Sequence, residues 1–127
     1  MKVLVTGWSG TLGTSLVPKL AAECHLVLVS RRSVVMEKLP NAIFLKCDYS
    51  YESIRMAAEG CEAIVHLAAQ RNPEQWLTNV ALDAKVFQVA QDLGIQNVVF
   101  ISTRGVYGLD SFHADEQAEV NPIDNYA

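Results

Sequence analysis

Short apolar runs alternate with helical patterns along most of this chain, and that alternation limits its fold more than any other feature. The runs have the length and composition of strands buried on both faces, and they are Lys2–Val5, Leu26–Ser30, Ile43–Lys46, Ala63–Leu67 and Asn97–Ser102. Helices are predicted between them, over Thr11–Glu23, Glu52–Glu59 and Pro73–Leu93. Strands separated by helices form β-α-β units. We therefore predict an α/β fold with a doubly wound parallel sheet, ordered 3-2-1-4-5.

Leucines, glycines and a proline set the limits of these helices. The first helix has leucines at four-residue spacing, at Leu12, Leu16 and Leu20. Pro18 lies inside it, where one backbone hydrogen bond is lost. Gly60 and Gly94 end the next two helices. Residues 109–127 have no long apolar pattern and are predicted to be loop.

The composition is that of an ordinary globular domain, with 50% apolar and 19% charged residues in a chain of 127. The formal net charge of −4 comes without a basic run, which argues against a nucleic-acid partner. No apolar run approaches the ~20 residues of a membrane span, and no signal peptide is recognised, so we expect a cytoplasmic protein. The cysteines and histidines lack ligand spacing and predict free thiols and no metal site; they are Cys24, Cys47, Cys61, His25, His66 and His113.

A TGxxGxxG run follows the first predicted strand and opens the first predicted helix. In such a loop the first glycine allows a tight turn, the second lets the backbone approach a pyrophosphate, and the third lets helix and strand pack closely. The helix N-terminus offers unpaired N–H groups and a partial positive charge to the phosphates. The alternative is a glycine-rich turn without a ligand. The predicted cofactor-binding residues here are Gly7, Trp8, Ser9, Gly10, Thr11, Leu12 and Gly13.

Two arginines, Arg31 and Arg32, follow the second predicted strand. A cofactor with a free ribose 2′-hydroxyl usually meets an acidic residue at this point, whereas a 2′-phosphate is met by arginine. No acidic residue lies between Val27 and Val34. The arginines therefore favour NADP over NAD, the alternative being that both are simply solvated.

The chain resembles the extended short-chain dehydrogenase/reductases, the NAD-dependent epimerases and dehydratases that act on sugar nucleotides. The resemblance covers the whole chain. Its marks, in order, are the glycine loop, Cys47-Asp48, His66-Leu67-Ala68-Ala69, Thr78-Asn79-Val80, Ile101-Ser102-Thr103 and Val106-Tyr107-Gly108. It implies a Rossmann-like domain followed by a smaller C-terminal substrate domain.

Further cofactor-binding residues are implied by this resemblance. Asp48, with Tyr49 beside it, matches the aspartate that accepts a hydrogen bond from the adenine amino group. Its alternative role is a cap for the helix that starts near Ser50. Leu67-Ala68-Ala69 matches the loop that passes the cofactor ribose, although it could serve strand packing alone. Asn79 matches an asparagine that supports the active site, unless it faces solvent.

The resemblance also implies two catalytic residues. Thr103 matches the hydroxyl residue that hydrogen-bonds the reacting substrate oxygen, while Ser102 beside it is interpreted as structural. Tyr107 is expected to shape the substrate pocket. Tyr126 falls where the family has the tyrosine of YxxxK, whose lysine favours the phenolate and holds the nicotinamide ribose. That lysine would come three residues after the last one given.

We therefore expect residues 1–127 to be the N-terminal, cofactor-binding part of a longer enzyme, incomplete before the last strands of the sheet. The alternative is a complete small protein whose final tyrosine is accidental. The expected activity is an NAD(P)-dependent epimerase, dehydratase or reductase acting on a nucleotide sugar. An uncovered sheet edge predicts poor stability or a homodimer. Competing hypotheses are an NADP-sensing regulator of the NmrA-like kind and a bare nucleotide-binding module.

Overall fold

A computed structural model describes residues 1–32, 39–109, 113–124 and 126. Its centre is a five-stranded sheet in the order β3-β2-β1-β4-β5, and every neighbouring pair is parallel. The strands are β1 (Lys2–Thr6), β2 (His25–Ser30), β3 (Ala42–Lys46), β4 (Ala63–His66) and β5 (Asn97–Phe100). The predicted fold class and strand order are confirmed.

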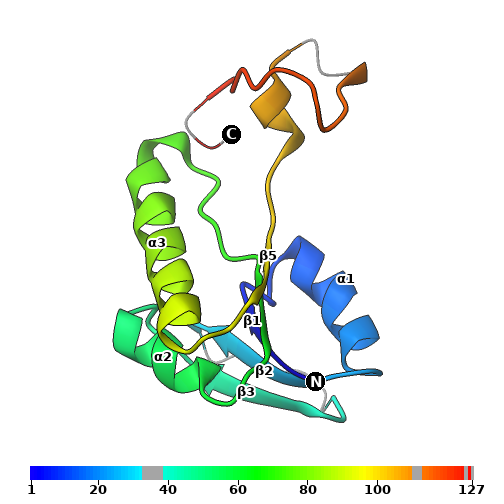
Figure 1. Cartoon of the computed structure of the whole chain (residues 1–127), viewed down its shortest axis with the longest axis vertical. Coiled ribbons are helices and arrows are strands. Elements are labelled where there is room, and N and C mark those ends of the chain that lie inside the picture. The colour runs from blue at the N-terminus through cyan, green and yellow to red at the C-terminus, as the bar shows by residue number, and fades with distance from the viewer. Residues whose placement is uncertain (33–38, 110–112, 125, 127) are drawn as a thin grey trace.

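Helices cover both faces of this sheet, with α1 (Thr11–Leu20) on one side and α2 (Tyr51–Ala58) and α3 (Trp76–Asp92) on the other (Figure 1). The side chains of β1 alternate between these layers, because successive residues of a strand point to opposite faces. Val3 and Val5 pack in the cluster that contains Val17 of α1. Leu4 packs in the opposite cluster with α2 and α3.

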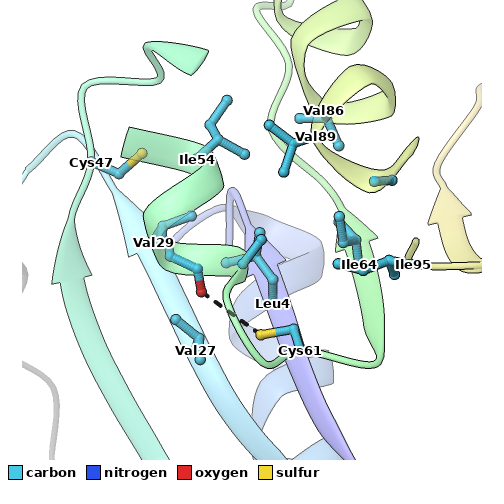
Figure 2. Close-up of a cluster of buried hydrophobic side chains, with 13 residues drawn as sticks. Leu4, Val27, Val29, Cys47, Ile54, Cys61, Ile64, Val86, Val89 and Ile95 are labelled. Atoms are coloured by element: carbon cyan, nitrogen blue, oxygen red, sulfur yellow. Dashed lines mark hydrogen bonds between the residues drawn. The ribbon is translucent and has the colours of Figure 1, made fainter. Parts of the chain in front are cut away.

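The larger cluster lies between the sheet, α2 and α3, and Figure 2 shows its members facing one another. Ile54 of α2 and Val86 and Val89 of α3 are fully buried there against Val27 and Val29 of β2. The strands inside the sheet are therefore covered on both faces, which explains their continuous apolar sequences.

Element ends differ from the predicted ones by more than one residue in three places. The first helix ends at Leu20 rather than Glu23, and a turn follows it. The third helix starts with a 3₁₀ turn (Pro73–Gln75) before α3 begins at Trp76. The last strand ends at Phe100, since residues 101–103 leave the sheet and lead into the 3₁₀ turn η2 (Arg104–Tyr107).

The buried face of α1 is formed by Gly13 and Val17. Leu12 is 57% exposed, although it has the same spacing as the half-buried Leu16 and Leu20. Leu12 stands in the first turn of α1 and borders an open cavity at the carboxyl ends of the strands.

The described part of the segment after η2 contains no α-helix or strand, in agreement with the predicted loop. Residues 110–112, 125 and 127 lie outside that part. At the edge strand β5 and just beyond it, apolar side chains are exposed, with Val99 at 51%, Phe100 at 46% and Ile101 at 41%. Among the described residues, no helix has the length and apolar character needed to cross a membrane.

Candidate functional site

The glycine loop connects β1 to α1 and closes as a tight turn, in which the Gly10 N–H donates to the Gly7 carbonyl over 3.0 Å. Gly7 has a φ of +66°, and a Cβ on it would lie 2.5 Å from the Ala68 nitrogen. A Cβ on Gly13 would lie 2.1 Å from the Trp8 carbonyl oxygen. Both positions therefore require glycine, because backbone of the loop after β4 and of the glycine loop itself fills the space of a side chain.

Trp8 is the one predicted cofactor residue whose side chain lies away from the cleft. It is 1% exposed and packs edge-on against Phe44 of β3, with 5.1 Å between the ring centroids. It belongs to the core beneath α1. The prediction of a cofactor contact can therefore hold only for its backbone, since the large apolar indole is more stable when buried.

The carboxyl ends of the strands border two adjoining cavities of about 650 and 600 Å³, and both cavities contact Gly7, Gly10 and the segment from Leu67 to Gln70. The first cavity holds Ser9, Arg31, Arg32, Asp48 and Tyr49. The second holds Thr11, Leu12, Gly13, Asn79, Thr103 and Tyr126. The structure thus brings every predicted site residue except Trp8 to one cleft, as expected where the strand order of a doubly wound sheet reverses.

Asp48 lies at the end of the first cavity and is exposed. Its carboxylate accepts a hydrogen bond of 2.9 Å from the Ser50 N–H. Hydrogen bonds from Ser53 and Ser50 lower the pKa of Asp48 to about 2, so it is ionised at neutral pH. The cap of α2 is Ser50, whose hydroxyl accepts from the Ser53 N–H. Asp48 therefore supports the turn before the helix and still faces the cleft.

Tyr49 joins the ends of three strands through its phenol. The hydroxyl accepts from the Gly7 N–H and donates to the Val29 carbonyl, each over 3.2 Å. Burial raises the pKa of this phenol. Its backbone has a φ of +62°, which is uncommon for a bulky residue. The sequence placed Tyr49 at the cofactor site, but this contact with the glycine loop could be seen only in three dimensions.

Asn79 of α3 holds the loop that follows β4. Its side-chain oxygen accepts from the Gln70 N–H over 2.7 Å, and its amide donates to the Gln70 carbonyl over 2.8 Å. The side chain is half-buried, so the alternative of a solvent-facing asparagine is wrong. The paired hydrogen bonds fix the backbone at the point where the two cavities meet.

Thr6, His66 and Asp83 form a hydrogen-bonded chain beneath the same loop, and none of the three was predicted as a site residue. The His66 Nε2 lies 2.9 Å from an Asp83 oxygen, and its Nδ1 contacts the Thr6 hydroxyl. His66 stands in the quoted HLAA motif, and Asp83 is four residues after Asn79. Those positions were the only sequence signal for this chain of contacts.

Thr103 and Tyr126 both border the second cavity. The Thr103 hydroxyl accepts from the Gly105 N–H over 3.2 Å and caps η2. Tyr126 is 37% exposed, and its N–H donates to the Asp124 carboxylate. Ser102 also borders this cavity, whereas Tyr107 is not among its contacts.

The C-terminal segment returns to the cleft because its backbone is bound to η2. The Asn121 N–H donates to the Val106 carbonyl over 2.7 Å, and the Ile123 N–H donates to the Gly105 carbonyl over 3.3 Å. Gly108 has a φ of +84°, and a Cβ there would lie 2.9 Å from the Asn121 oxygen. The segment at the C-terminal end of the ribbon folds back toward α3 as a result (Figure 1).

A parallel 3-2-1-4-5 sheet with a glycine loop at the carboxyl end of its first strand defines a Rossmann-like domain. The model of the NAD dependent epimerase/dehydratase family matches residues 3–127, and the chain belongs to that family.

Two of the curated relatives are named for reactions of glucose derivatives. The UDP-glucose 4-epimerase of Mycolicibacterium smegmatis is 31% identical over 100% of this chain and 47% of its own length. The NAD-dependent glucose-6-phosphate dehydrogenase of Haloferax volcanii is 27% identical over 84% of this chain and 44% of its own length. The chain thus spans less than half the length of these two relatives.

Solved structures share the fold. The UDP-N-acetylglucosamine 4-epimerase of Bacillus cereus has a TM-score of 0.86 at 23% identity, over 99% of this chain and 44% of that one. The UDP-glucose 4-epimerase of Thermotoga maritima, solved with UDP-glucose, has a TM-score of 0.81 at 26% identity, over 99% and 46%. At such identities the first of these comparisons supports the fold alone.

Proposed function

We propose that this chain is the cofactor-binding part of an NAD(P)-dependent epimerase, dehydratase or reductase that converts a nucleotide sugar. The observation that carries the proposal is the single cleft between the glycine loop, the loop after β4 and the pair Thr103 and Tyr126. These groups come from distant parts of the chain. The nucleotide-sugar substrate rests on what the epimerases among the relatives are named for.

The glycine loop fits the diphosphate of a dinucleotide. Gly10 caps α1 without a side-chain hydrogen bond, and the first turn contains no acidic residue. The first N–H groups of α1 are therefore free of a competing side-chain acceptor, and the helix dipole favours a negative charge beside them. Bound there, NAD(P) supplies a nicotinamide that accepts or donates hydride.

The adenosine end of the cleft favours NADP in our proposal. Arg31 and Arg32 directly follow β2, are exposed, and border the first cavity. Two guanidinium groups can hold a 2′-phosphate with charge-assisted hydrogen bonds. Asp48, which is ionised, is placed to accept from an adenine amino group at the same end.

Thr103 and Tyr126 are the proposed catalytic residues. The Thr103 oxygen accepts from the Gly105 N–H, which leaves its own proton free to donate to a substrate oxygen. Tyr126 would exchange the proton of the substrate hydroxyl as hydride moves to or from the carbon that bears it. Both residues border the second cavity, where Thr103 is half-buried and Tyr126 is 37% exposed.

The substrate domain is proposed to lie outside residues 1–127. The chain spans less than half of the relatives described above, and the exposed apolar side chains near β5 are suited to burial by a further segment. A homodimer of the full-length protein is part of the same proposal. Analytical ultracentrifugation tests it, and a full-length protein that remains monomeric at all concentrations would contradict it.

The function is tested in the full-length gene product with UDP-sugars and both cofactors. We expect product formation to fall by about 10²–10⁴-fold in Tyr126→Phe, because proton transfer by one positioned group contributes about that factor. Cofactor affinity should be retained, since only a hydroxyl is removed. Tyr51→Phe is the matched control, because Tyr51 lies on α2, bonds to Asp92 and borders neither cavity. Full activity in Tyr126→Phe would refute the catalytic role of that residue.

A further inference from the structure

A chain of hydrogen bonds runs from α3 through the sheet to the cofactor cleft. Asp83 of α3 lies 2.9 Å from the Nε2 of His66 at the end of β4. The Nδ1 of His66 lies 2.5 Å from the hydroxyl oxygen of Thr6 at the end of β1. That oxygen accepts from the Ala68 N–H over 3.3 Å. Four groups from β1, the end of β4, the loop after it and α3 are therefore connected in series.

The chemistry of these groups gives the chain one direction. An ionised carboxylate only accepts, so the proton of a neutral His66 lies on Nε2, which donates to Asp83. The Nδ1 then accepts from the Thr6 hydroxyl, whose remaining lone pair receives the Ala68 N–H. Burial lowers the pKa of His66, which keeps the ring neutral. Asp83 thereby selects the tautomer that the rest of the chain needs.

His66 has no free group to offer a substrate. Its side chain is 1% exposed, and both ring nitrogens are engaged. The Asp83 side chain is 25% exposed and borders the second cavity, and its Oδ1 is engaged by the imidazole. The pair therefore acts through the residues it holds rather than on a reacting atom.

The held residue, Ala68, is packed against the glycine loop. The backbone of Leu67 and Ala68 approaches Gly7 so closely that a Cβ on Gly7 would lie 2.5 Å from the Ala68 nitrogen. Asn79, one helical turn before Asp83, binds the backbone of Gln70 in the same loop. Thus α3 fixes the loop at two points, and the loop borders both cavities.

We propose that Asp83 is a positioning residue for the dinucleotide: acting through His66 and Thr6, it fixes the Ala68 backbone beside Gly7 and so sets the affinity of the cleft for NAD(P). This inference rests on the proposed function, because it assumes that the cleft binds a dinucleotide. Displacement of the loop by a fraction of an ångström alters the gap between Gly7 and Ala68, where backbone atoms are already in contact.

The test measures the Kd of NADPH and NADH by calorimetry, and the thermal midpoint, in variants of the full-length protein. Asp83→Ala should weaken cofactor binding by about 3- to 10-fold, the usual effect of losing one buried hydrogen bond. Asp83→Asn keeps an acceptor oxygen and should restore most of the affinity. Asp92→Ala is the matched control, because Asp92 lies on the same helix but binds Tyr51 of α2. Asp92→Ala should lower the thermal midpoint without changing the Kd of either cofactor.

A double-mutant cycle separates positioning from general loss of structure. Thr6→Val retains the shape of Thr6 and removes its hydroxyl, so it should weaken binding to a similar extent. The double variant Thr6→Val with Asp83→Ala should be no weaker than the worse single variant, because both changes interrupt one chain.

Several outcomes would overturn the proposal. An unchanged Kd in Thr6→Val would do so even if Asp83→Ala failed to fold. Additive losses in the double variant, or equal behaviour of Asp83→Ala and Asp92→Ala, would do the same. A wild-type protein that binds neither NADPH nor NADH would instead refute the proposed function itself.

Discussion

The two ends of the cleft are built in different ways. The cofactor end stands on β1, β2 and β4, whose residues are almost all buried, and backbone atoms of the glycine loop and of the loop after β4 lie in direct contact. The opposite end stands on residues 101–109, 113–124 and 126 beyond the edge strand β5. Most of these side chains are exposed, and a few backbone hydrogen bonds hold the segment. The fold itself fixes the first end, whereas the second depends on local contacts.

That difference separates binding from chemistry. Phosphate recognition requires only backbone N–H groups and a helix terminus, which a packed sheet positions without further help. Proton transfer requires two side chains in register with a substrate, and Thr103 and Tyr126 come from segments with little buried surface. We infer that stability and cofactor binding can be changed separately from catalysis in this protein.

The largest expected effect is on the free energy of unfolding, when a glycine at either end of the cleft is replaced by alanine. Gly13→Ala should destabilise the fold by more than about 3 kcal/mol, because its Cβ would meet the rigid Trp8 backbone. Gly108→Ala should cost about 1–2 kcal/mol for its left-handed backbone and should release the segment around Asn121. Chemical denaturation measures both values.

Gly94→Ala is the control for this pair, because Gly94 also has a positive φ but a Cβ there meets nothing within 4 Å. It should cost about 1 kcal/mol. Equal losses in Gly13→Ala and Gly94→Ala would show that the close contact at the glycine loop does not limit stability.

A second prediction concerns the cofactor end alone. Replacing Arg31 and Arg32 together by alanine should weaken NADPH binding about 10- to 100-fold and leave NADH binding unchanged, because hydrogen bonds to charged groups contribute about 1.5–3 kcal/mol. Calorimetric titration of both cofactors provides the measurement. Arg55→Ala is the matched control, since Arg55 pairs with Glu59 on α2 away from the cleft. NADPH affinity that survives the double change would exclude a phosphate role for these arginines.

A smaller effect is expected in the pH dependence of the free energy of unfolding, through His66 at the end of β4. The ring centroids of His66 and Phe100 of β5 are 5.9 Å apart, with the rings tilted. Burial lowers the pKa of His66 below its value of about 6.5 in the unfolded chain. The unfolded chain therefore binds more protons in this range. The contribution of His66 to the free energy of unfolding is complete above about pH 6.5. It is lost as the pH falls from there through the pKa of the folded state, by at most about 1.4 kcal/mol per pH unit.

Urea unfolding between pH 5 and 7.5 measures this slope. His66→Gln should remove most of it, whereas His25→Gln should retain it, because His25 on β2 is exposed. The carboxylate of Asp83 opposes the shift, and β1 and β5 contribute the uncharged Thr6 and Phe100 to the same surroundings. A slope that persists unchanged in His66→Gln would assign it to other groups.

The cleft could be predicted from sequence to the extent that it depends on local patterns. Glycine spacing at the end of an apolar run predicted the glycine loop. The family resemblance assigned Thr103 and Tyr126 to one site, and both border the second cavity. Trp8 shows where such reasoning fails. Its position in the loop suggested the cofactor, but its indole lies in the core, because the space beneath α1 accommodates it.

The sequence by itself determined the elements, their parallel order and the position of the glycine loop, because periodicity and glycine spacing act over a few residues. Only the tertiary structure decided which side chains support that loop. The supporting contacts join residues that are 9 to 62 positions apart. They are the bond of the Tyr49 phenol to Gly7, that of the Asn79 amide to Gln70, and the chain of hydrogen bonds from Asp83 to Ala68. Polar contacts of this kind depend on the register and packing of separate strands and helices, and no local pattern encodes them.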